Sequence, residues 1–376
     1  MSYIESNIIN NESDMNIYTT VDALYNAIYH SSDFFLVIKN LPGNNTLYVD
    51  IDNTKLEELL RTGDNPICDI SVGSGLCIES AKPFLSDIIN NKEMVMRDPS
   101  ALYVLNMQSE ECNELQMKYG VVCQPASSPN MDFLINNHKC GSSIEAGTWG
   151  NYFSKLDTTP ANSIIICDRY IFSDDDVAIQ EGKLSFTSGN GCENILHILD
   201  RMLPPSLNVD FHIMIIFDKT IYHGRERYPS TRHKEMDDAH FRYLASHLNK
   251  AIKKLRKENY IITTELISVT QNDYLHEETH NRRIVSNYSE LFVEHKLAAF
   301  KGSRGAVDQH IVYNTLFSEG LKDKSDLPIY SHTRRLNVFR EIVNYGKHNE
   351  KAYDYVRNGN FSGSKISELK NRLIVH

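Results

Sequence analysis

The sequence lacks an apolar run long enough to cross a membrane, and its seven cysteines form no C-x-x-C pair. A membrane-spanning helix needs about 20 consecutive apolar residues, so no span is expected. Closely paired cysteines are the usual sign of a zinc knuckle or a redox motif, and their absence argues against both. The scattered cysteines predict reduced thiols. The polar, acidic first residues do not resemble a signal peptide, and together these features predict a cytoplasmic protein.

Positive charge is scarce overall but concentrated in one segment. The net charge of the 376-residue chain is −10, which argues against a protein that coats nucleic acid with its whole surface. Residues 219–257 nevertheless hold eleven Lys and Arg against four Asp and Glu, a local charge of +7. Such a patch can bind an anionic ligand whatever the charge of the rest of the chain.

Residues 1–150 are expected to form one irregular α/β unit. Apolar periodicity predicts helices over 19–30, 54–61 and 79–90 and strands over 34–40, 47–51 and 101–106. The stretch 120–160 is rich in Pro, Ser, Asn and Gly and is the best candidate for a domain boundary. Trp149, the only tryptophan, is expected in the core.

The pattern sharpens after residue 160. Apolar runs rich in β-branched residues predict buried strands over 162–172, 211–217 and 261–269, helical spacing predicts helices over 192–203 and 237–258, and 282–287 with 290–293 predicts a hairpin. Strands that alternate with helices predict an α/β fold, a mixed sheet with flanking helices. The segment 307–376 is expected to be a helical tail.

The helix expected over 237–258 has two distinct faces. Its apolar stripe includes Phe241, Leu244 and Leu248. The opposite face carries a row of cations, namely Arg242, Lys250, Lys253, Lys254 and Lys257. This basic face is either a phosphate- or nucleic-acid-binding surface or an ordinary solvated helix face.

The stretch 276–283, HEETHNRR, contains two overlapping motifs. The first is H-E-x-x-H, from His276 to His280, which on a helix presents two zinc ligands with Glu277 as general base. The charged Glu278 and the β-rich residues that follow argue against such a helix, so a zinc metalloprotease is a remote alternative, and no metal or other cofactor is expected.

The second motif is H-x-R, from His280 to Arg282, and it lies in a suggestive series of elements. The stretches IIICDRYIF, NILHILDRML, FHIMIIF, the basic helix, YIITTELISV, THNRRIVSNYSELFV and EHKLAAFK follow one another between residues 162 and 301. This order resembles the phospholipase D-like domain found at the C-terminus of MIT-domain proteins. The predicted organisation is therefore an N-terminal unit over 1–150, a phospholipase D-like domain over 160–306 and a tail over 307–376.

The resemblance implies a set of site residues. It points to His280 as the catalytic residue if the site is active, and to Arg282 as a phosphate ligand. It also implies binding roles for the residues at the first strand end and near the hairpin, which are Asp168, Arg169, Lys296 and Lys301. The alternatives are structural roles: His280 is a strand-end histidine bonded to the backbone, and Asp168 and Arg169 form a local ion pair. Of Arg282 and Arg283, which alternate across a strand, one is expected to be solvated.

The sequence departs from the catalytic template H-x-K-x4-D. Arg282 stands at the lysine position and Asn287 at the aspartate position, and the residue after His280 is Asn281. In the template the carboxylate orients the nucleophilic histidine, and a second H-x-K supplies the acid. These departures predict a catalytically degenerate module that recognises a phosphate-bearing ligand, nucleic acid first, or a protein partner in a larger microbial complex, conceivably in antiviral defence. The alternative is a phosphodiesterase or nuclease that uses His280 in a homodimer.

Overall fold

The described part of the chain consists mainly of helices and strands. The computed structural model describes residues 34–38, 46–49, 52–62, 77–80, 102–106, 108–125, 139–142, 148–154, 156, 158–169, 171–172, 176–180, 183–188, 191–218, 220–222, 233–235, 238–256, 259–269, 282–293, 297, 310–315, 335–342, 353–357, 360–361 and 369–374.

A five-stranded sheet is built from the first third of the chain. Its order is β3-β2-β4-β1-β5, with β2 parallel to β3 and β4 and with β1 antiparallel to β4 and β5. The strands are β1 (Phe34–Ile38), β2 (Thr46–Val49), β3 (Cys77–Ser80), β4 (Leu102–Asn106) and β5 (Val122–Pro125), and the helices are α3 (Asn53–Thr62) and α7 (Ser109–Tyr119). The strands expected over 34–40, 47–51 and 101–106 and the helix over 54–61 are confirmed, whereas the helix over 19–30 lies outside the described residues. The helix expected over 79–90 is wrong at its start, because Glu79 and Ser80 belong to β3, and residues 81–90 lie outside the described residues.

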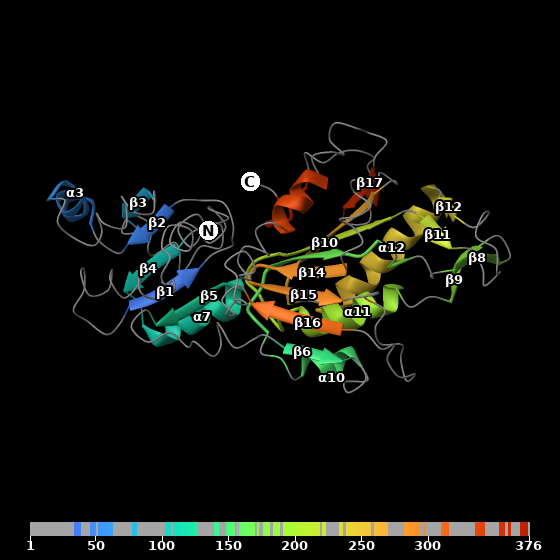
Figure 1. The fold of residues 1–376 in the computed structure, drawn as a ribbon, viewed down its shortest axis with the longest axis horizontal. Helices are drawn as coiled ribbons and strands as arrows, with labels where there is room; N and C mark the ends of the chain where they lie inside the picture. The colour runs from blue at the N-terminus through green and yellow to red at the C-terminus, as the bar shows by residue number, and fades with distance from the viewer. Residues whose placement is uncertain are drawn as a thin grey trace.

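A nine-stranded mixed sheet forms the larger part of the molecule (Figure 1). Its order is β18-β17-β13-β10-β7-β14-β15-β16-β6. The strands are β6 (Lys139–Ser142), β7 (Ser163–Cys167), β10 (Phe211–Asp218), β13 (Ile262–Val269), β14 (Arg282–Ser286), β15 (Ser289–Val293), β16 (His310–Thr315), β17 (Tyr353–Arg357) and β18 (Asn360–Phe361). The predicted mixed α/β architecture is thus confirmed for the described residues.

Three parallel strands occupy the middle of this sheet. Strand β10 pairs in parallel with β7 on one side and β13 on the other. The chain passes from β7 to β10 through α11 (Gly191–Met202) and from β10 to β13 through α12 (Asp238–Leu255). Parallel neighbours require such crossover connections, and the strand–helix alternation expected from the sequence is confirmed here.

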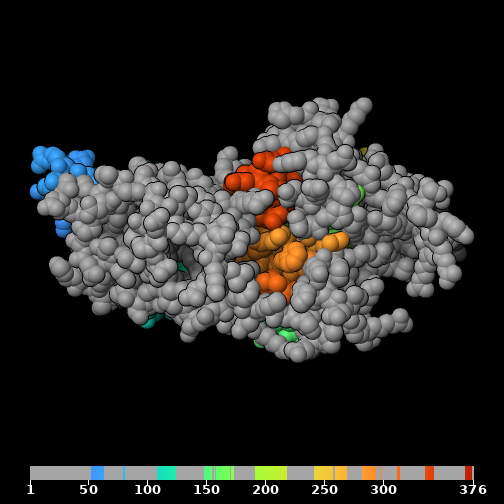
Figure 2. Space-filling model, viewed as in Figure 1, coloured from blue at the N-terminus to red at the C-terminus, as the bar shows by residue number. Residues whose placement is uncertain are grey.

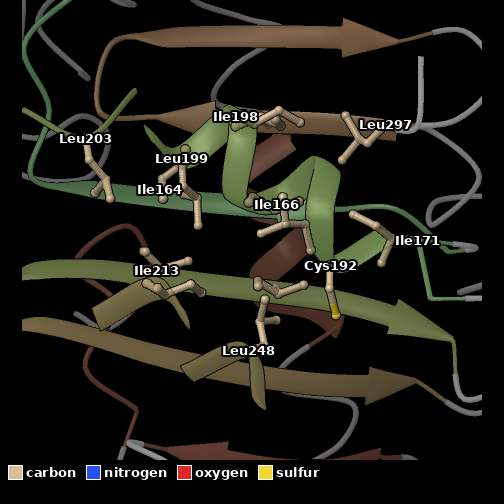
Figure 3. Packing of buried hydrophobic residues seen from close by; sticks show 14 of the residues in the cluster. Ile164, Ile166, Ile171, Cys192, Ile198, Leu199, Leu203, Ile213, Leu248 and Leu297 are labelled. Carbon is tan, nitrogen blue, oxygen red and sulfur yellow. The ribbon is translucent and has the colours of Figure 1, made fainter. Parts of the chain in front are cut away.

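Both crossover helices cover the same face of the sheet. Side chains alternate across a strand, so Ile164 and Ile166 of β7 face α11 and α12 while Ile165 and Cys167 face away. Figure 3 shows Ile198 and Leu199 of α11 and Leu248 of α12 over Ile164, Ile166 and Ile213. Trp149 of α10 (Trp149–Phe153) belongs to the same core, as expected. Its indole N–H donates to Asn194 Oδ1 at 3.0 Å.

The opposite face is covered by the last third of the chain. A helix over 335–342 contributes Leu336, Phe339 and Ile342, and the segment 369–374 adds Leu369 and Leu373. Figure 2 shows the helix beside the described residues of β14 and β15.

The expectation of a helical tail over 307–376 is wrong in part. This segment contributes β16, β17 and β18 to the large sheet besides the helix over 335–342. Strand β17 pairs with β13, which lies about 90 residues earlier in the chain. Such a partner leaves no mark on local periodicity, so short polar strands of this kind escape a sequence pattern.

Backbone contacts join the two sheets at the N-terminal end of β7. The side chain of Asn162 donates to Tyr119 O at 2.8 Å, and the backbone N–H of Val122 donates to the hydroxyl of Tyr288 at 3.3 Å. Gly120, between α7 and β5, has φ +65°, and a Cβ there would lie 2.3 Å from Ala161 O. Only glycine fits this left-handed position pressed against the backbone of the second sheet.

Two β-ribbons interrupt the crossover connections. Strands β8 (Asp176–Gln180) and β9 (Lys183–Ser188) lie between β7 and α11, and β11 (Thr220–Tyr222) and β12 (His233–Glu235) lie between β10 and α12. Both ribbons therefore follow the carboxyl ends of parallel strands. Among the described residues, no helix is long and apolar enough to span a membrane.

Candidate functional site

The site expected from the resemblance lies at the carboxyl end of β7. Asp168 directly follows this strand, and its side chain is fully buried. Its backbone N–H donates to Ile216 O at 3.1 Å, and its carbonyl accepts from the N–H of Ile171 at 3.3 Å. The carboxyl edge of parallel strands is where α/β proteins commonly place ligands, so Asp168 stands at a position that suits a binding site.

The carboxylate of Asp168 connects three separate segments. Its Oδ2 accepts a hydrogen bond from the backbone N–H of Leu297 at 3.0 Å, and its Oδ1 lies 4.0 Å from Nε of Arg282. At that distance the contact with Arg282 is electrostatic rather than a hydrogen bond. The carboxylate therefore positions both the start of β14 and the segment after β15 against β7.

The buried carboxylate of Asp168 requires charge compensation. A buried carboxylate requires a cationic or hydrogen-bonded partner because burial removes its hydration. Arg282, with a side chain that is 16 % exposed, lies 4.0 Å from the Asp168 carboxylate, and Arg169, the next residue in the sequence, is only 3 % exposed. Asp168 and Arg282 carry opposite charges, and the structure brings these two predicted site residues together.

Asn287 lies at the other end of β14. Its side chain is fully buried, and its Oδ1 accepts from the backbone N–H groups of Asn162 and Ser163 at 2.9 and 3.0 Å. Its Nδ2 donates to Asn162 Oδ1 at 3.1 Å. Arg282 and Asn287 are five positions apart along the strand, or roughly 17 Å at 3.4 Å per residue. Asn287 thus secures the start of β7 and lies far from the Asp168–Arg282 pair.

Several expected site residues lie outside the described residues. These are His280, His276, Glu277, Lys296, Lys301 and Lys257. The described chain resumes with Arg282 as the first residue of β14, so His280 precedes a strand by two positions. Among the described residues, no group of three or more His, Cys, Asp or Glu side chains could hold a metal ion. The H-E-x-x-H motif lies outside the described residues, so the zinc alternative stays a prediction.

Arg283 faces the opposite side of the sheet from Arg282 and is engaged in contacts within the protein. It forms an ion pair with Glu290, and its guanidinium lies 4.8 Å from the ring centroid of Phe292. Nε of Arg335 is 3.9 Å from the same Glu290 carboxylate. Arg335 is the first residue of the helix over 335–342. The expectation of a solvated partner is therefore wrong, because Arg283 and Glu290 help to attach that helix to the sheet.

The basic face of α12 is exposed. Lys250, Lys253 and Lys254 all point to solvent, whereas Leu248 and Ile252 are buried. These lysines lie near the end of α12, next to the amino end of β13, while Arg282 lies at the carboxyl end of the parallel strands. The two predicted binding groups consequently lie at opposite ends of the sheet and cannot share one phosphate group.

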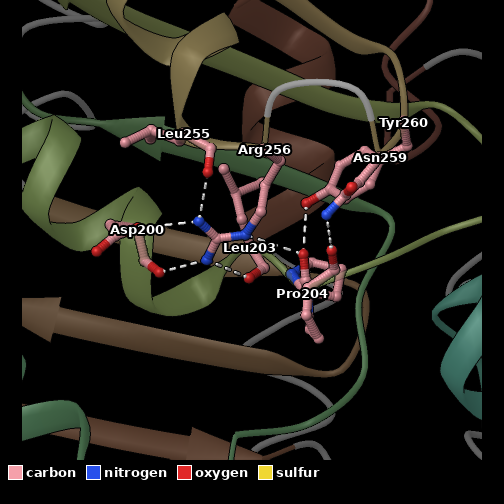
Figure 4. A network of polar contacts seen from close by, with 8 residues as sticks. Asp200, Leu203, Pro204, Leu255, Arg256, Asn259 and Tyr260 are labelled. Carbon is pink, nitrogen blue, oxygen red and sulfur yellow. Dashed lines mark hydrogen bonds and ion pairs between the residues drawn. The ribbon is translucent and has the colours of Figure 1, made fainter.

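Arg256, counted in the basic segment, has a structural role (Figure 4). Its guanidinium pairs with the Asp200 carboxylate at 2.9 Å and donates to four carbonyl oxygens at 2.6–3.1 Å. Those oxygens belong to Asp200, Leu203, Pro204 and Leu255. A cation at the ends of two helices satisfies carbonyls that lack intrahelical partners. Arg256 therefore ties α11 to α12 and is not available as a ligand-binding cation.

Sequence patterns missed the groups that organise the site. The Leu297 N–H is a backbone group, and Glu290, Phe292 and Arg335 meet only through long-range packing. The alternation of β15 could have placed Glu290 on the face of Arg283, but no local signal indicates Arg335. No family model matches the sequence, and no curated protein sequence matches it significantly.

Proposed function

We propose that residues 160–306 form a phospholipase D-like domain that binds a phosphate-bearing ligand and has lost phosphodiester hydrolysis. Nucleic acid is the ligand class that its charges suit best. The observation that carries the proposal is the position of Asn287, which stands where the catalytic template has a carboxylate. Its side chain is occupied by the backbone of Asn162 and Ser163 at the far end of β14 from Arg282.

Loss of catalysis follows from what the template requires. A histidine nucleophile depends on a carboxylate that orients its ring and on a second group that acts as acid. Asn287 carries no charge, so no carboxylate stands at the template's aspartate position. Asp168, the carboxylate beside Arg282, is already engaged with Leu297 and with Arg282 itself.

Retention of phosphate binding is supported by Arg282. A guanidinium is always charged and presents a planar fork of donors that matches phosphate oxygens. Asp168 holds Arg282 at the carboxyl edge of the sheet, with 16 % of its side chain exposed. A site built on a buried, strand-anchored pair has a defined geometry, as recognition of a phosphate requires.

A polymer suits the arrangement better than a small phosphate compound. Helix α12 has 18 residues, or about 27 Å at 1.5 Å per residue. The exposed lysines lie near the end of α12, whereas Arg282 lies at the carboxyl edge of the sheet. A single phosphate group cannot contact both. A nucleic acid strand that runs along α12 would contact both groups, and successive phosphates would each add an electrostatic contribution.

The test measures direct binding of fluorescein-labelled single-stranded DNA and RNA by fluorescence anisotropy in buffer with EDTA. The oligonucleotides have about 20 nucleotides, which is longer than a typical single-strand site. The expected result is salt-dependent binding, weakened about 10-fold or more by Arg282→Gln, because a charged hydrogen bond contributes roughly 1.5–3 kcal/mol. Arg61→Gln is the matched control, because Arg61 is exposed on α3 and lies far from Arg282 in the sequence.

Two results would contradict the proposal. One is an absence of binding to either oligonucleotide at the lowest salt. The other is cleavage of the labelled strand in EDTA, which would support the dimeric phosphodiesterase instead. Cleavage that requires added zinc and is abolished by EDTA would point to the H-E-x-x-H motif.

A further inference from the structure

Two cysteines of the N-terminal unit lie in contact with each other. Cys112 is in α7 and Cys123 is in β5, and their Sγ atoms are 2.6 Å apart. Both side chains are buried, at 3 % and 4 % exposure. The sulfur atoms are close to the separation of about 2.05 Å that a disulfide bond requires.

The chain between these cysteines holds them in place. Gly120 ends α7 with its N–H donating to Gln116 O at 3.2 Å, and Val121 leads directly into β5. The side chain of Gln116 accepts a hydrogen bond from the backbone N–H of Cys123 at 3.2 Å. Because helix, turn and strand are fixed by these contacts, the two thiols are presented to each other without any rearrangement of the backbone.

We propose that Cys112 and Cys123 form a dithiol that closes reversibly to a disulfide when the protein meets a peroxide or a small-molecule disulfide. With hydrogen peroxide, one thiol is oxidised to a sulfenic acid with release of water. The second thiol then attacks that sulfur, forms the S–S bond and expels a second water. With a small disulfide, two exchange steps transfer the bond to the protein and release two small thiols.

Burial makes this closure slow but stable. Burial raises the pKa of the Cys123 thiol, so little reactive thiolate is present at neutral pH. The oxidant can therefore reach the sulfur atoms only through a local opening of α7 and β5. Once the bond has formed, the same burial keeps reductants away from it. The pair is thus suited to form a disulfide during prolonged exposure to an oxidant, and not to rapid catalytic cycles of oxidation and reduction.

The bond would also affect the contact between the two sheets. Val122, next to Cys123, donates its N–H to the hydroxyl of Tyr288 in the large sheet, and the carbonyl of Lys118 in α7 accepts from the N–H of Asn208. A bond between α7 and β5 would restrain both of these contacts. Oxidation is therefore expected to raise the melting temperature of the full-length protein.

Peptide mapping of the full chain tests the proposal. The protein is oxidised with hydrogen peroxide or with oxidised dithiothreitol, its remaining thiols are alkylated after denaturation, and it is digested with trypsin. Cleavage after Lys118 separates Cys112 from Cys123, so their peptides stay together only when the bond exists. The expected result is one cross-linked species, about 2 Da lighter than the sum of the two peptides, which dithiothreitol separates.

The kinetics and variants complete the test. Sub-denaturing urea should accelerate closure several-fold, because local opening limits it. Cys112→Ala and Cys123→Ala should each abolish the cross-link, while Cys192→Ala in α11 should not. The proposal is overturned if oxidation leaves the two peptides separate, carries either cysteine to the sulfonic acid without a cross-link, or joins Cys112 or Cys123 to another cysteine. The mapping of the unaltered protein decides the matter even if an alanine variant does not fold.

Discussion

The carboxylate of Asp168 holds the backbone N–H of Leu297 at 3.0 Å across 129 positions of the sequence, and it does so from a fully buried position. The same carboxylate lies 4.0 Å from Nε of Arg282. One charged group thus positions the two segments that flank the hairpin β14–β15. Its stability contribution and its role in binding can be separated by paired substitutions.

Arg282→Gln alone should lower the free energy of unfolding by about 1–3 kcal/mol, because it leaves a buried carboxylate without its nearest cation. The double variant Asp168→Asn with Arg282→Gln should be less destabilised than Arg282→Gln, since the buried carboxylate that lost its nearest cation is then neutral. Urea unfolding followed by the fluorescence of Trp149 measures both. Equal destabilisation of the single and double variants would show that the pair is not coupled.

Arg256 provides a second stability test. Arg256→Lys should lower the free energy of unfolding by about 1–3 kcal/mol, because an ammonium group cannot reach the Asp200 carboxylate and four carbonyl oxygens together. Lys250→Arg, on the exposed face of the same helix, is the matched control and should change it by less than about 0.5 kcal/mol. A similar loss in both variants would refute the assignment.

The exposed lysines of α12 should contribute to nucleic acid binding additively. Neutralising Lys250, Lys253 and Lys254 to Gln should reduce the slope of log K against log salt by about 0.7–0.9 for each phosphate that the protein no longer neutralises. Anisotropy titrations at several salt concentrations give that slope. The control neutralises Lys55 and Arg61, which are exposed on α3, and Lys118, a half-buried residue of α7 that pairs with Glu114. An unchanged slope in the α12 variant would identify an ordinary solvated face.

Buried tyrosines predict loss of stability at alkaline pH. Burial raises the pKa of Tyr288 and of Tyr260 above the usual value of about 10. The unfolded chain then releases these protons at lower pH than the folded chain, so their contribution is fully present below about pH 10 and is lost as the pH rises further. Urea unfolding between pH 8 and pH 11 should show this decline.

Tyr288→Phe isolates part of that effect. This substitution should lower the free energy of unfolding by about 1–3 kcal/mol at neutral pH, because the buried Val122 N–H loses its acceptor. It should also make the decline above pH 10 shallower, since one of the shifted groups is gone. A steeper or unchanged decline would mean that Tyr288 does not ionise with unfolding.

The middle of the large sheet could be predicted because its signals are local. Strands β7, β10 and β13 are continuous apolar runs, and α12 has a clear stripe that includes Phe241 and Leu248. Helix α7 gave no comparable signal. Its buried side chains are only Cys112, Leu115 and Tyr119 among many polar residues. Its position depends on contacts with β5 and the large sheet, which no window of sequence contains.

The site was only partly predictable for a related reason. Asp168 and Arg282 could be placed near each other by resemblance to a known domain, and the structure brings them together. The role of Asn287 could not be foreseen. The H-x-K-x4-D spacing places it at the template's aspartate position, whereas its partners Asn162 and Ser163 are 125 and 124 residues away. Long-range hydrogen bonds of this kind decide whether a polar residue is structural or functional.

The decisive experiment concerns His280, where the binding and catalytic alternatives predict opposite outcomes. If the module binds without catalysis, His280→Ala should leave oligonucleotide affinity within about 2-fold of the parent, and neither protein should cleave the strand. Arg282→Gln should then be the damaging change, since it removes a charged phosphate ligand. If the site is catalytic, His280→Ala would abolish cleavage while binding persists, and a phosphohistidine would accumulate on the parent protein during turnover. We expect no such adduct, because Asn287 carries no charge and is bonded to the start of β7, which leaves the imidazole without the template's orienting group. Mass spectrometry of acid-avoiding digests after incubation with oligonucleotide checks this, and a phosphorylated peptide that contains His280 would overturn the binding-only assignment.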